Sequence, residues 1–178
     1  MESIALAAAD KPARYRELLP QLAALLDGEP DLIANLANAA AALRECVPAA
    51  SWIGFYILRG GELVLGPFQG KVACVRIAFG RGVCGTAAAE QRTLVVPDVD
   101  QFPGHIACDA GSRSEIVVPI IRSGRPGRSG QPERSGQSGG RGELVAVLDL
   151  DSYERAAFDN ADADGLQPIA ELLGTLAW

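Results

Sequence analysis

Four cysteines and one histidine are the side chains of this 178-residue chain best suited to nucleophilic, redox or metal chemistry. They are Cys46, Cys74, Cys84, Cys108 and His105. Successive cysteines are 28, 10 and 24 residues apart, so the chain lacks the Cys-x-x-Cys pair that most structural zinc sites use. We therefore expect no bound metal, and we expect the cysteines to be buried core thiols or to carry out thiol redox chemistry.

Cys84 lies in a glycine-rich segment, residues 80–85, that is followed by alanines. This pattern predicts a tight turn that opens a short helix, with Cys84 near the helix start. The positive end of the helix dipole lowers the pKa of a thiol placed there, which a reactive thiolate requires. The glycines lack the spacing of a phosphate-binding loop and no Lys-Ser or Lys-Thr pair follows them, so nucleotide binding is not favoured.

His105 precedes Cys108 by three residues. If this turn is helical, the imidazole can face the thiol and form a Cys/His nucleophile pair with it. The alternative is that His105 is a surface or capping residue. Cys46 falls in the last turn of a predicted helix, where we expect it to be a small buried hydrophobe.

Two aromatic residues flank a glycine on one face of a predicted strand, residues 51–58. Because side chains alternate along a strand, Trp52, Gly54 and Tyr56 share that face. They could form a shallow slot for a small ligand, floored by the glycine and walled by the two rings. The alternative is ordinary packing on both faces of the sheet.

Three carboxylates belong to two apolar strands predicted in the second half of the chain. Glu115 begins the strand over residues 115–121, and Asp149 and Asp151 share one face at the end of the strand over 143–151. Carboxylates two residues apart on one face repel each other and require a cation or a proton between them. The alternative is an exposed strand end.

The overall composition argues against several classes of protein. A formal net charge of −6 makes a surface that neutralises phosphates improbable, so we expect no nucleic-acid partner. The longest apolar runs, such as 116–121 and 144–150, are far below the roughly 20 residues of a membrane span. Residues 1–11 lack the features of a secretion signal, so we expect no membrane association and a cytoplasmic location.

The order of the predicted elements indicates an α+β sandwich with an antiparallel sheet. We expect helices over 12–27, 31–47, 87–90 and 159–178, and strands over 51–58, 62–68, 73–79, 93–97, 115–121 and 143–151. Pro168 should delay or kink the last helix. Residues 123–142 contain seven glycines, four arginines and no apolar residue, which predicts a flexible Gly/Arg/Ser-rich insertion between two strands of a hairpin.

Six stretches of the chain resemble the free methionine-(R)-sulfoxide reductases, which are small proteins of the GAF fold. They are residues 66–74, 79–88, 96–99, 102–109, 114–119 and 147–152. The resemblance runs from about residue 8 to the C-terminus, apart from the insertion at about 123–142, which is longer than the turn of the family. It implies one GAF-like domain over residues 1–178, with a central antiparallel sheet of about six strands between helices.

The resemblance also implies roles for the candidate residues. Cys108 corresponds to the thiol that attacks the sulfoxide sulfur, and Cys84 and Cys74 correspond to the thiols that form disulfides afterwards. The sequence leaves open whether Cys108 or Cys84 is the nucleophile. The aromatic pair corresponds to the residues that hold the methyl group and side chain of the substrate. The three carboxylates, Glu115, Asp149 and Asp151, correspond to those that bind its amino group and sulfoxide oxygen.

The implied chemistry suits these residue types. A sulfoxide oxygen leaves only when protonated, and crowded carboxylates raise each other's pKa, so Glu115 and Asp151 are the expected acids. Attack leaves a sulfenic acid on Cys108, which a second thiol converts to a disulfide. We expect no tightly bound cofactor, an external dithiol such as thioredoxin as reductant, and a homodimer as one assembly to test.

Two alternatives remain at this stage. One is a GAF sensor module that binds a nucleotide, bilin or haem without catalysis, which would not require three thiols. The other is a thiol peroxidase that uses Cys108, which would leave the aromatic slot and the carboxylates unexplained.

Overall fold

The computed structural model describes residues 4–106, 108–122 and 142–178. Its elements follow the chain as α1 (Lys11–Leu26), α2 (Leu32–Cys46), β1 (Trp52–Arg59), β2 (Glu62–Gln69), β3 (Arg76–Ala78), α3 (Gly82–Glu90), β4 (Leu94–Val96), the 3₁₀ helix η1 (Val99–Gln101), β5 (Ser114–Ile121), β6 (Leu144–Ser152) and α4 (Asn160–Leu173). The flexible insertion predicted over 123–142 lies, except for Gly142, outside the described residues.

The strands form one antiparallel six-stranded sheet in the order β3-β2-β1-β6-β5-β4. The two central strands, β1 and β6, come from opposite halves of the chain, and each also pairs with its neighbour in sequence. The α+β class, the antiparallel sheet and the number of strands predicted from the sequence are confirmed. The predicted hairpin of β5 and β6 is also present.

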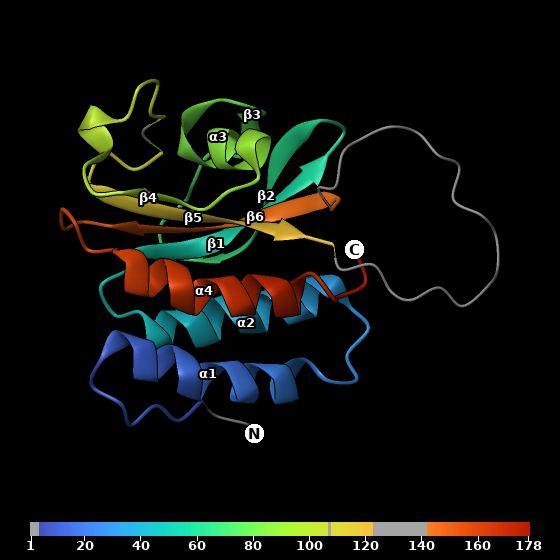
Figure 1. Cartoon of the computed structure of the whole chain (residues 1–178). Coiled ribbons are helices and arrows are strands. Elements are labelled where there is room, and N and C mark those ends of the chain that lie inside the picture. The colour runs from blue at the N-terminus through green and yellow to red at the C-terminus, as the bar shows by residue number, and fades with distance from the viewer. Residues whose placement is uncertain (1–3, 107, 123–141) are drawn as a thin grey trace.

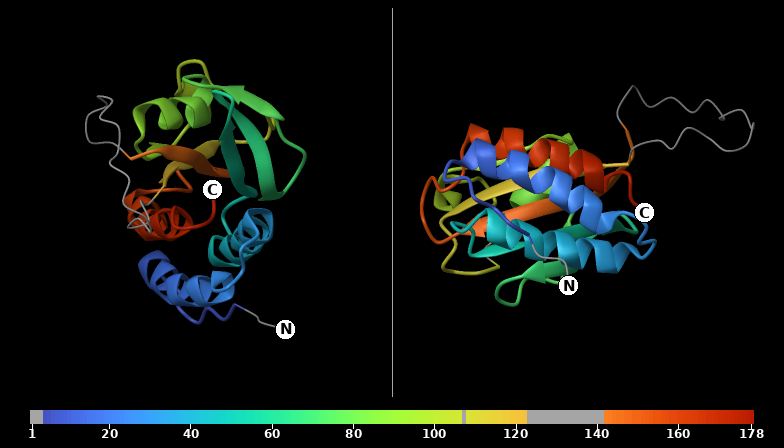
Figure 2. Two further views of the ribbon diagram at one scale, coloured as in Figure 1. Left: turned by 90° about the vertical axis from the view of Figure 1, so that its right-hand side faces the viewer. Right: turned by 90° about the horizontal axis from the view of Figure 1, so that it is seen from below.

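Helices cover the two faces of the sheet unequally (Figure 1). α2 and α4 pack on one face, and α1 packs across both of them as an outer layer, while the short α3 lies on the opposite face (Figure 2). Side chains therefore alternate between two cores. Ile53, Phe55 and Ile57 of β1 enter the core under α2 and α4, whereas Trp52 and Tyr56 enter the core under α3.

Aspartates fix where the three long helices begin. The side chains of Asp10 and Asp31 accept hydrogen bonds from backbone N–H groups in the first turns of α1 and α2. Asp159 and Asp162 form a reciprocal capping box at the start of α4. Because that cap fixes the start, Pro168 lies inside α4 and does not delay it, so the delay predicted from Pro168 is wrong.

The third predicted strand is shorter than expected. Only Arg76–Ala78 forms β3, although the apolar pattern predicted a strand over 73–79. The carbonyl of Cys74 instead accepts a 3.1 Å hydrogen bond from the hydroxyl of Tyr56, which turns this part of the chain toward the face that carries α3. Among the described residues, none of the helices has the length and hydrophobicity that crossing a bilayer requires.

Candidate active site

A pocket opens on the face of the sheet that carries α3. Its walls come from β1, β5, β6, the start of α3 and two loops, one between β2 and β3 and one between η1 and β5. The candidate residues that line it are Trp52, Tyr56, Cys84, His105, Cys108, Glu115, Asp149 and Asp151. The structure thus brings together candidates that are up to 99 residues apart in sequence.

The sheet register places two of the three carboxylates and the first aromatic ring in one row. Asp151 on β6 pairs with Trp52 on β1 at one side and with Glu115 on β5 at the other. Asp149 lies in the next row on the same face, opposite Gly54. The expectation that the two aspartates share a face is confirmed, and their strand end is not exposed to solvent.

Burial dominates the ionisation of these carboxylates. It raises the pKa of Glu115 and of Asp149 well above the usual range, and the negative charges of the neighbouring aspartates add to this effect. Burial also raises the pKa of Asp151, to about 6, although a hydrogen bond donated by the Ser112 hydroxyl favours its ionised form. Oδ1 of Asp149 is buried and has no hydrogen-bond partner among the described residues.

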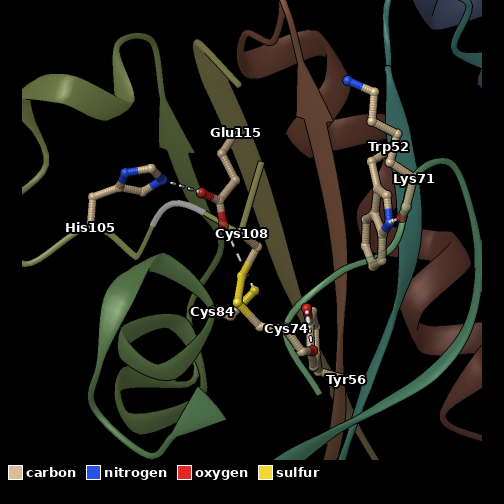
Figure 3. The surroundings of a disulfide bond; sticks show 8 residues. All are labelled: Trp52, Tyr56, Lys71, Cys74, Cys84, His105, Cys108 and Glu115. Atoms are coloured by element: carbon tan, nitrogen blue, oxygen red, sulfur yellow. Dashed lines mark hydrogen bonds and ion pairs between the residues drawn. A yellow bond between two sulfur atoms is a disulfide. The ribbon is translucent and has the colours of Figure 1, made fainter. Parts of the chain in front are cut away.

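Two loops meet at the mouth of the pocket through a disulfide bond between Cys74 and Cys108 (Figure 3). Cys108 is exposed and Cys74 is partly buried. Cys84 lies next to this pair as a buried free thiol (Figure 3). Cys46 is also free, but it is buried in the core under the helices, as its place in the sequence predicted.

The prediction of a lowered pKa for Cys84 is wrong. Cys84 is the third residue of α3, yet burial, together with the charges of Asp149 and Glu115, raises its pKa well above the usual range. Its Sγ donates a 3.8 Å hydrogen bond to Oε1 of Glu115. The helix is only nine residues long, so the desolvation of a buried thiolate outweighs its dipole.

The predicted pairing of His105 with Cys108 is also wrong. The described residues of the segment 103–109 form turns and contain no helix, so the three-residue spacing does not bring the two side chains face to face. Nε2 of His105 instead lies 3.8 Å from Oε2 of Glu115 (Figure 3). Burial lowers the pKa of His105, which favours the neutral imidazole.

Trp52 and Tyr56 share one face of β1 and line the pocket, as predicted, but the slot predicted over Gly54 is not open, because the Trp52 indole itself lies across that glycine. The rings of Trp52 and Tyr56 have centroids 6.0 Å apart, and Phe68 of β2 stacks on Trp52 at 5.4 Å. A Cβ atom on Gly54 would lie 2.5 Å from Cη2 of Trp52 and 2.5 Å from Cβ of Phe68. Only glycine therefore lets the indole lie across the strand here.

Comparison with known proteins identifies the family. Residues 31–176 match the GAF domain. The chain is 43% identical to the free methionine-R-sulfoxide reductase of Escherichia coli over 169 residues, which are 94% of this chain and 92% of that protein. It is 40% identical to the Saccharomyces cerevisiae protein of the same name, over 92% of this chain and 86% of that protein. The chain belongs to the free methionine-R-sulfoxide reductases of the GAF family.

Solved structures of this reductase family agree with the fold. A crystal structure of the free methionine-R-sulfoxide reductase of Neisseria meningitidis in complex with its substrate superposes with a TM-score of 0.85 and is 45% identical. The match covers 98% of this chain and 94% of that one. The predicted GAF-like fold and the resemblance itself are therefore confirmed.

Several residues at this reductase pocket escaped the sequence reasoning. Asp109, next to Cys108, accepts a 2.8 Å hydrogen bond from the hydroxyl of Tyr153 and lies 3.2 Å from Nζ of Lys71. Lys71 also lies over the Tyr153 ring. Lys71 and Asp109 fall inside the stretches that carry the family resemblance, which was an available signal, whereas nothing in the sequence singled out Tyr153 or Ser112.

Proposed function

We propose that this protein reduces free methionine (R)-sulfoxide to methionine, with Cys108 as the attacking thiolate and Cys74 as the thiol that closes the disulfide. One observation carries the proposal. The Cys74–Cys108 disulfide lies at the mouth of a pocket that is also lined by two aromatic rings and three carboxylates, two of them buried. A peroxidase would need only the thiols, and a sensor would need only the pocket.

Cys108 is a better nucleophile than Cys84 in this arrangement. The thiolate is the reactive form of a cysteine, and burial among carboxylates opposes ionisation of Cys84. Cys108 is exposed at the pocket mouth, within bonding distance of Cys74. We therefore assign attack to Cys108 and resolution to Cys74, whereas Cys84 lines the pocket wall and takes no part in the first disulfide.

The carboxylates supply the proton that the reaction consumes. The Cys108 thiolate adds to the sulfoxide sulfur while the sulfoxide oxygen takes a proton from Glu115 or Asp151. The hydroxyl group then moves from the methionine sulfur to Sγ of Cys108 as the new sulfur–sulfur bond breaks, which releases methionine and leaves a sulfenic acid on Cys108. Burial beside other carboxylates raises the pKa of Glu115 well above its usual range, which favours the protonated acid. The Cys74 thiol then displaces water from the sulfenic acid and forms the disulfide.

The remaining groups suit a free amino acid. The rings of Trp52 and Tyr56 provide an apolar surface for the methyl thioether. The unpartnered Oδ1 of Asp149 can accept a hydrogen bond from the ammonium group, which methionine within a peptide lacks. Peptide-bound methionine sulfoxide would leave this buried carboxylate oxygen unpaired, and that free-energy cost would make it bind more weakly than the free amino acid.

Recycling requires an external dithiol. A thiolate of a protein such as thioredoxin would attack the Cys74–Cys108 disulfide and restore both thiols, so no tightly bound cofactor is needed. We place this cycle in the cytoplasm, where such reductants act, and the homodimer remains a proposal for measurement in solution.

The proposal is tested by supplying the free R and S epimers of methionine sulfoxide with dithiothreitol and measuring methionine. We expect turnover of the free R epimer alone, and no turnover of N-acetylated or peptide-bound sulfoxide. Cys108→Ser should abolish turnover, while Cys46→Ser, at a distant buried thiol, should retain it. Absence of turnover with the R epimer, or equal turnover of the peptide-bound form, contradicts the proposal. Faster consumption of hydrogen peroxide than of sulfoxide would favour the peroxidase instead.

A further inference from the structure

Three acidic side chains at the floor of the pocket lie at the spacing of metal ligands. Sγ of Cys84 and one carboxylate oxygen each of Glu115 and Asp149 all lie within 4.8 Å of one another. Sγ of Cys84 is 3.8 Å from Oε1 of Glu115. Tetrahedral zinc holds a sulfur at about 2.3 Å and an oxygen at about 2.1 Å, so two such ligands are about 3.6 Å apart. Little movement is needed to close the cluster around one ion.

A second observation concerns Asp149, one member of this cluster. Asp149 is only 5% exposed, and its Oδ1 has no hydrogen-bond partner among the described residues. A buried carboxylate oxygen without a partner is destabilising, and a cation on it would remove that penalty. The three side chains come from α3, β5 and β6, whose packing fixes their relative positions.

The ligand set selects the kind of ion. Calcium and magnesium prefer oxygen atoms alone, whereas one thiolate with two carboxylates suits a borderline-soft ion such as Zn²⁺. Three protein ligands leave the fourth tetrahedral position to water. His105, with Nε2 3.8 Å from Oε2 of Glu115, lies where an outer-sphere partner could orient that carboxylate.

We propose that Cys84, Glu115 and Asp149 form an inhibitory Zn²⁺ site that competes with the substrate for the floor of the pocket. Zn²⁺ binds the thiolate and carboxylate forms of these groups, so its binding releases protons. The zinc site differs from a structural zinc site, whose Cys-x-x-Cys spacing the chain lacks, because its ligands are distant in sequence. Competition with the substrate rests on the proposed function, whereas binding of the ion does not.

The oxidised protein isolates the site for measurement. With the Cys74–Cys108 disulfide formed, only Cys84 and Cys46 remain as thiols. ZnCl₂ titrated calorimetrically into oxidised protein should bind at about one ion per chain. Cys84→Ser and Asp149→Asn should each weaken binding at least 100-fold, more than the roughly 10–100-fold lost with an outer-sphere partner. Cys46→Ala should leave it unchanged.

A cobalt measurement on the wild-type protein tests the site even if a variant fails to fold. Co²⁺ added to the oxidised wild-type protein should produce the near-ultraviolet charge-transfer band of a cobalt–thiolate bond. No zinc binding, no thiolate band, or binding that is lost in Cys46→Ala and kept in Cys84→Ser would each overturn the zinc site.

Competition is tested separately, on the same oxidised protein, which cannot turn over. Free methionine (R)-sulfoxide should raise the apparent dissociation constant of zinc, while the same concentration of glycine, which chelates zinc through the same amino and carboxylate groups, should raise it less. Equal effects of the two amino acids would overturn the inhibitory role and leave the reductase proposal intact. A metal-free assay without turnover would overturn the reductase proposal and leave zinc binding intact.

Discussion

The hydroxyl of Tyr56 donates a 3.1 Å hydrogen bond to the backbone carbonyl of Cys74. Nε1 of Trp52 donates a 3.0 Å hydrogen bond to the carbonyl of Lys71, three residues earlier in the same loop. The two rings assigned to the substrate slot therefore also hold the loop that carries the resolving thiol. Substrate binding and disulfide formation share these side chains, which links the two halves of the proposed cycle.

Tyr56→Phe should separate the two roles of this ring. The variant keeps the aromatic wall and loses one partly buried neutral hydrogen bond, worth about 1 kcal/mol, or roughly fivefold in an equilibrium constant. We expect the Cys74–Cys108 disulfide to become about fivefold easier to reduce in equilibration with dithiothreitol, with a small change in KM. Tyr15→Phe, which removes a hydroxyl bound to Asp162 on the other side of the sheet, is the matched control. An unchanged disulfide equilibrium in Tyr56→Phe would show that the loop does not depend on this bond.

Gly54→Ala should damage the substrate slot. The new methyl group would meet the Trp52 ring and Cβ of Phe68 at 2.5 Å, which forces the indole out of its place. Overpacking of this kind costs about 1–3 kcal/mol, so we expect KM for free methionine (R)-sulfoxide to rise about tenfold or more. Gly66→Ala, on β2 and outside the pocket lining, should lower the melting temperature without raising KM. If both variants raise KM equally, the effect comes from the sheet and not from the slot.

The sheet could be predicted from the sequence because strand periodicity is a local property. Alternation along β1 and β6 placed Trp52 and Tyr56 on one face and Asp149 and Asp151 on one face, and the structure agrees. The boundaries of the four-residue helix predicted over 87–90 were less accurate, since α3 begins at Gly82. Glycines that looked like a turn are accommodated in the first turns of a buried helix.

The electrostatics of the site could not be predicted in the same way. The sign of the pKa shift at Cys84 depends on burial and on Glu115 and Asp149, which other strands bring to it. The disulfide likewise joins Cys74 and Cys108 across 34 residues of chain, through two loops without periodicity. The residue types indicated thiol redox chemistry, but only the family resemblance assigned individual roles to these thiols, and it left Cys74 and Cys84 as equal candidates for resolution.

Cys74→Ser should stop the cycle after one turnover when thioredoxin is the only reductant. The Cys108 thiolate is intact in this variant, so about one methionine per chain should be released before the sulfenic acid accumulates. A sulfenic-acid reagent such as dimedone should then label Cys108, as mass spectrometry would detect. Cys84→Ser should turn over repeatedly, because its buried thiol has no part in the Cys74–Cys108 disulfide. Repeated turnover by Cys74→Ser together with a single turnover by Cys84→Ser would reverse the two assignments.

The buried carboxylates should make the oxidised, substrate-free protein less stable as pH rises. A carboxyl group whose pKa is raised by folding keeps its proton up to a higher pH in the native state than in the unfolded state. Its contribution to the free energy of unfolding is therefore complete below its unfolded pKa and is lost as the pH rises through its folded pKa. For Asp151 this window runs from about 4 to about 6, while the lowered pKa of His105 acts in the opposite direction below about 6.5. Glu115 and Asp149, whose pKa values burial raises well above the usual range, should continue the decline above that window.

Asp149→Asn should flatten this decline. Each proton held only by the native state contributes a slope of about 1.4 kcal/mol per pH unit to the free energy of unfolding, and the amide has no such proton to lose. We therefore expect urea denaturation of the oxidised variant to show a smaller loss of stability between pH 7 and 8, and a higher stability than wild type at pH 8, while its affinity for methionine sulfoxide falls. Asp164→Asn, at an exposed position on α4, should follow the wild-type profile. A wild-type protein with no decline over this range, or a variant that declines as steeply, would show that Asp149 is ionised before substrate arrives.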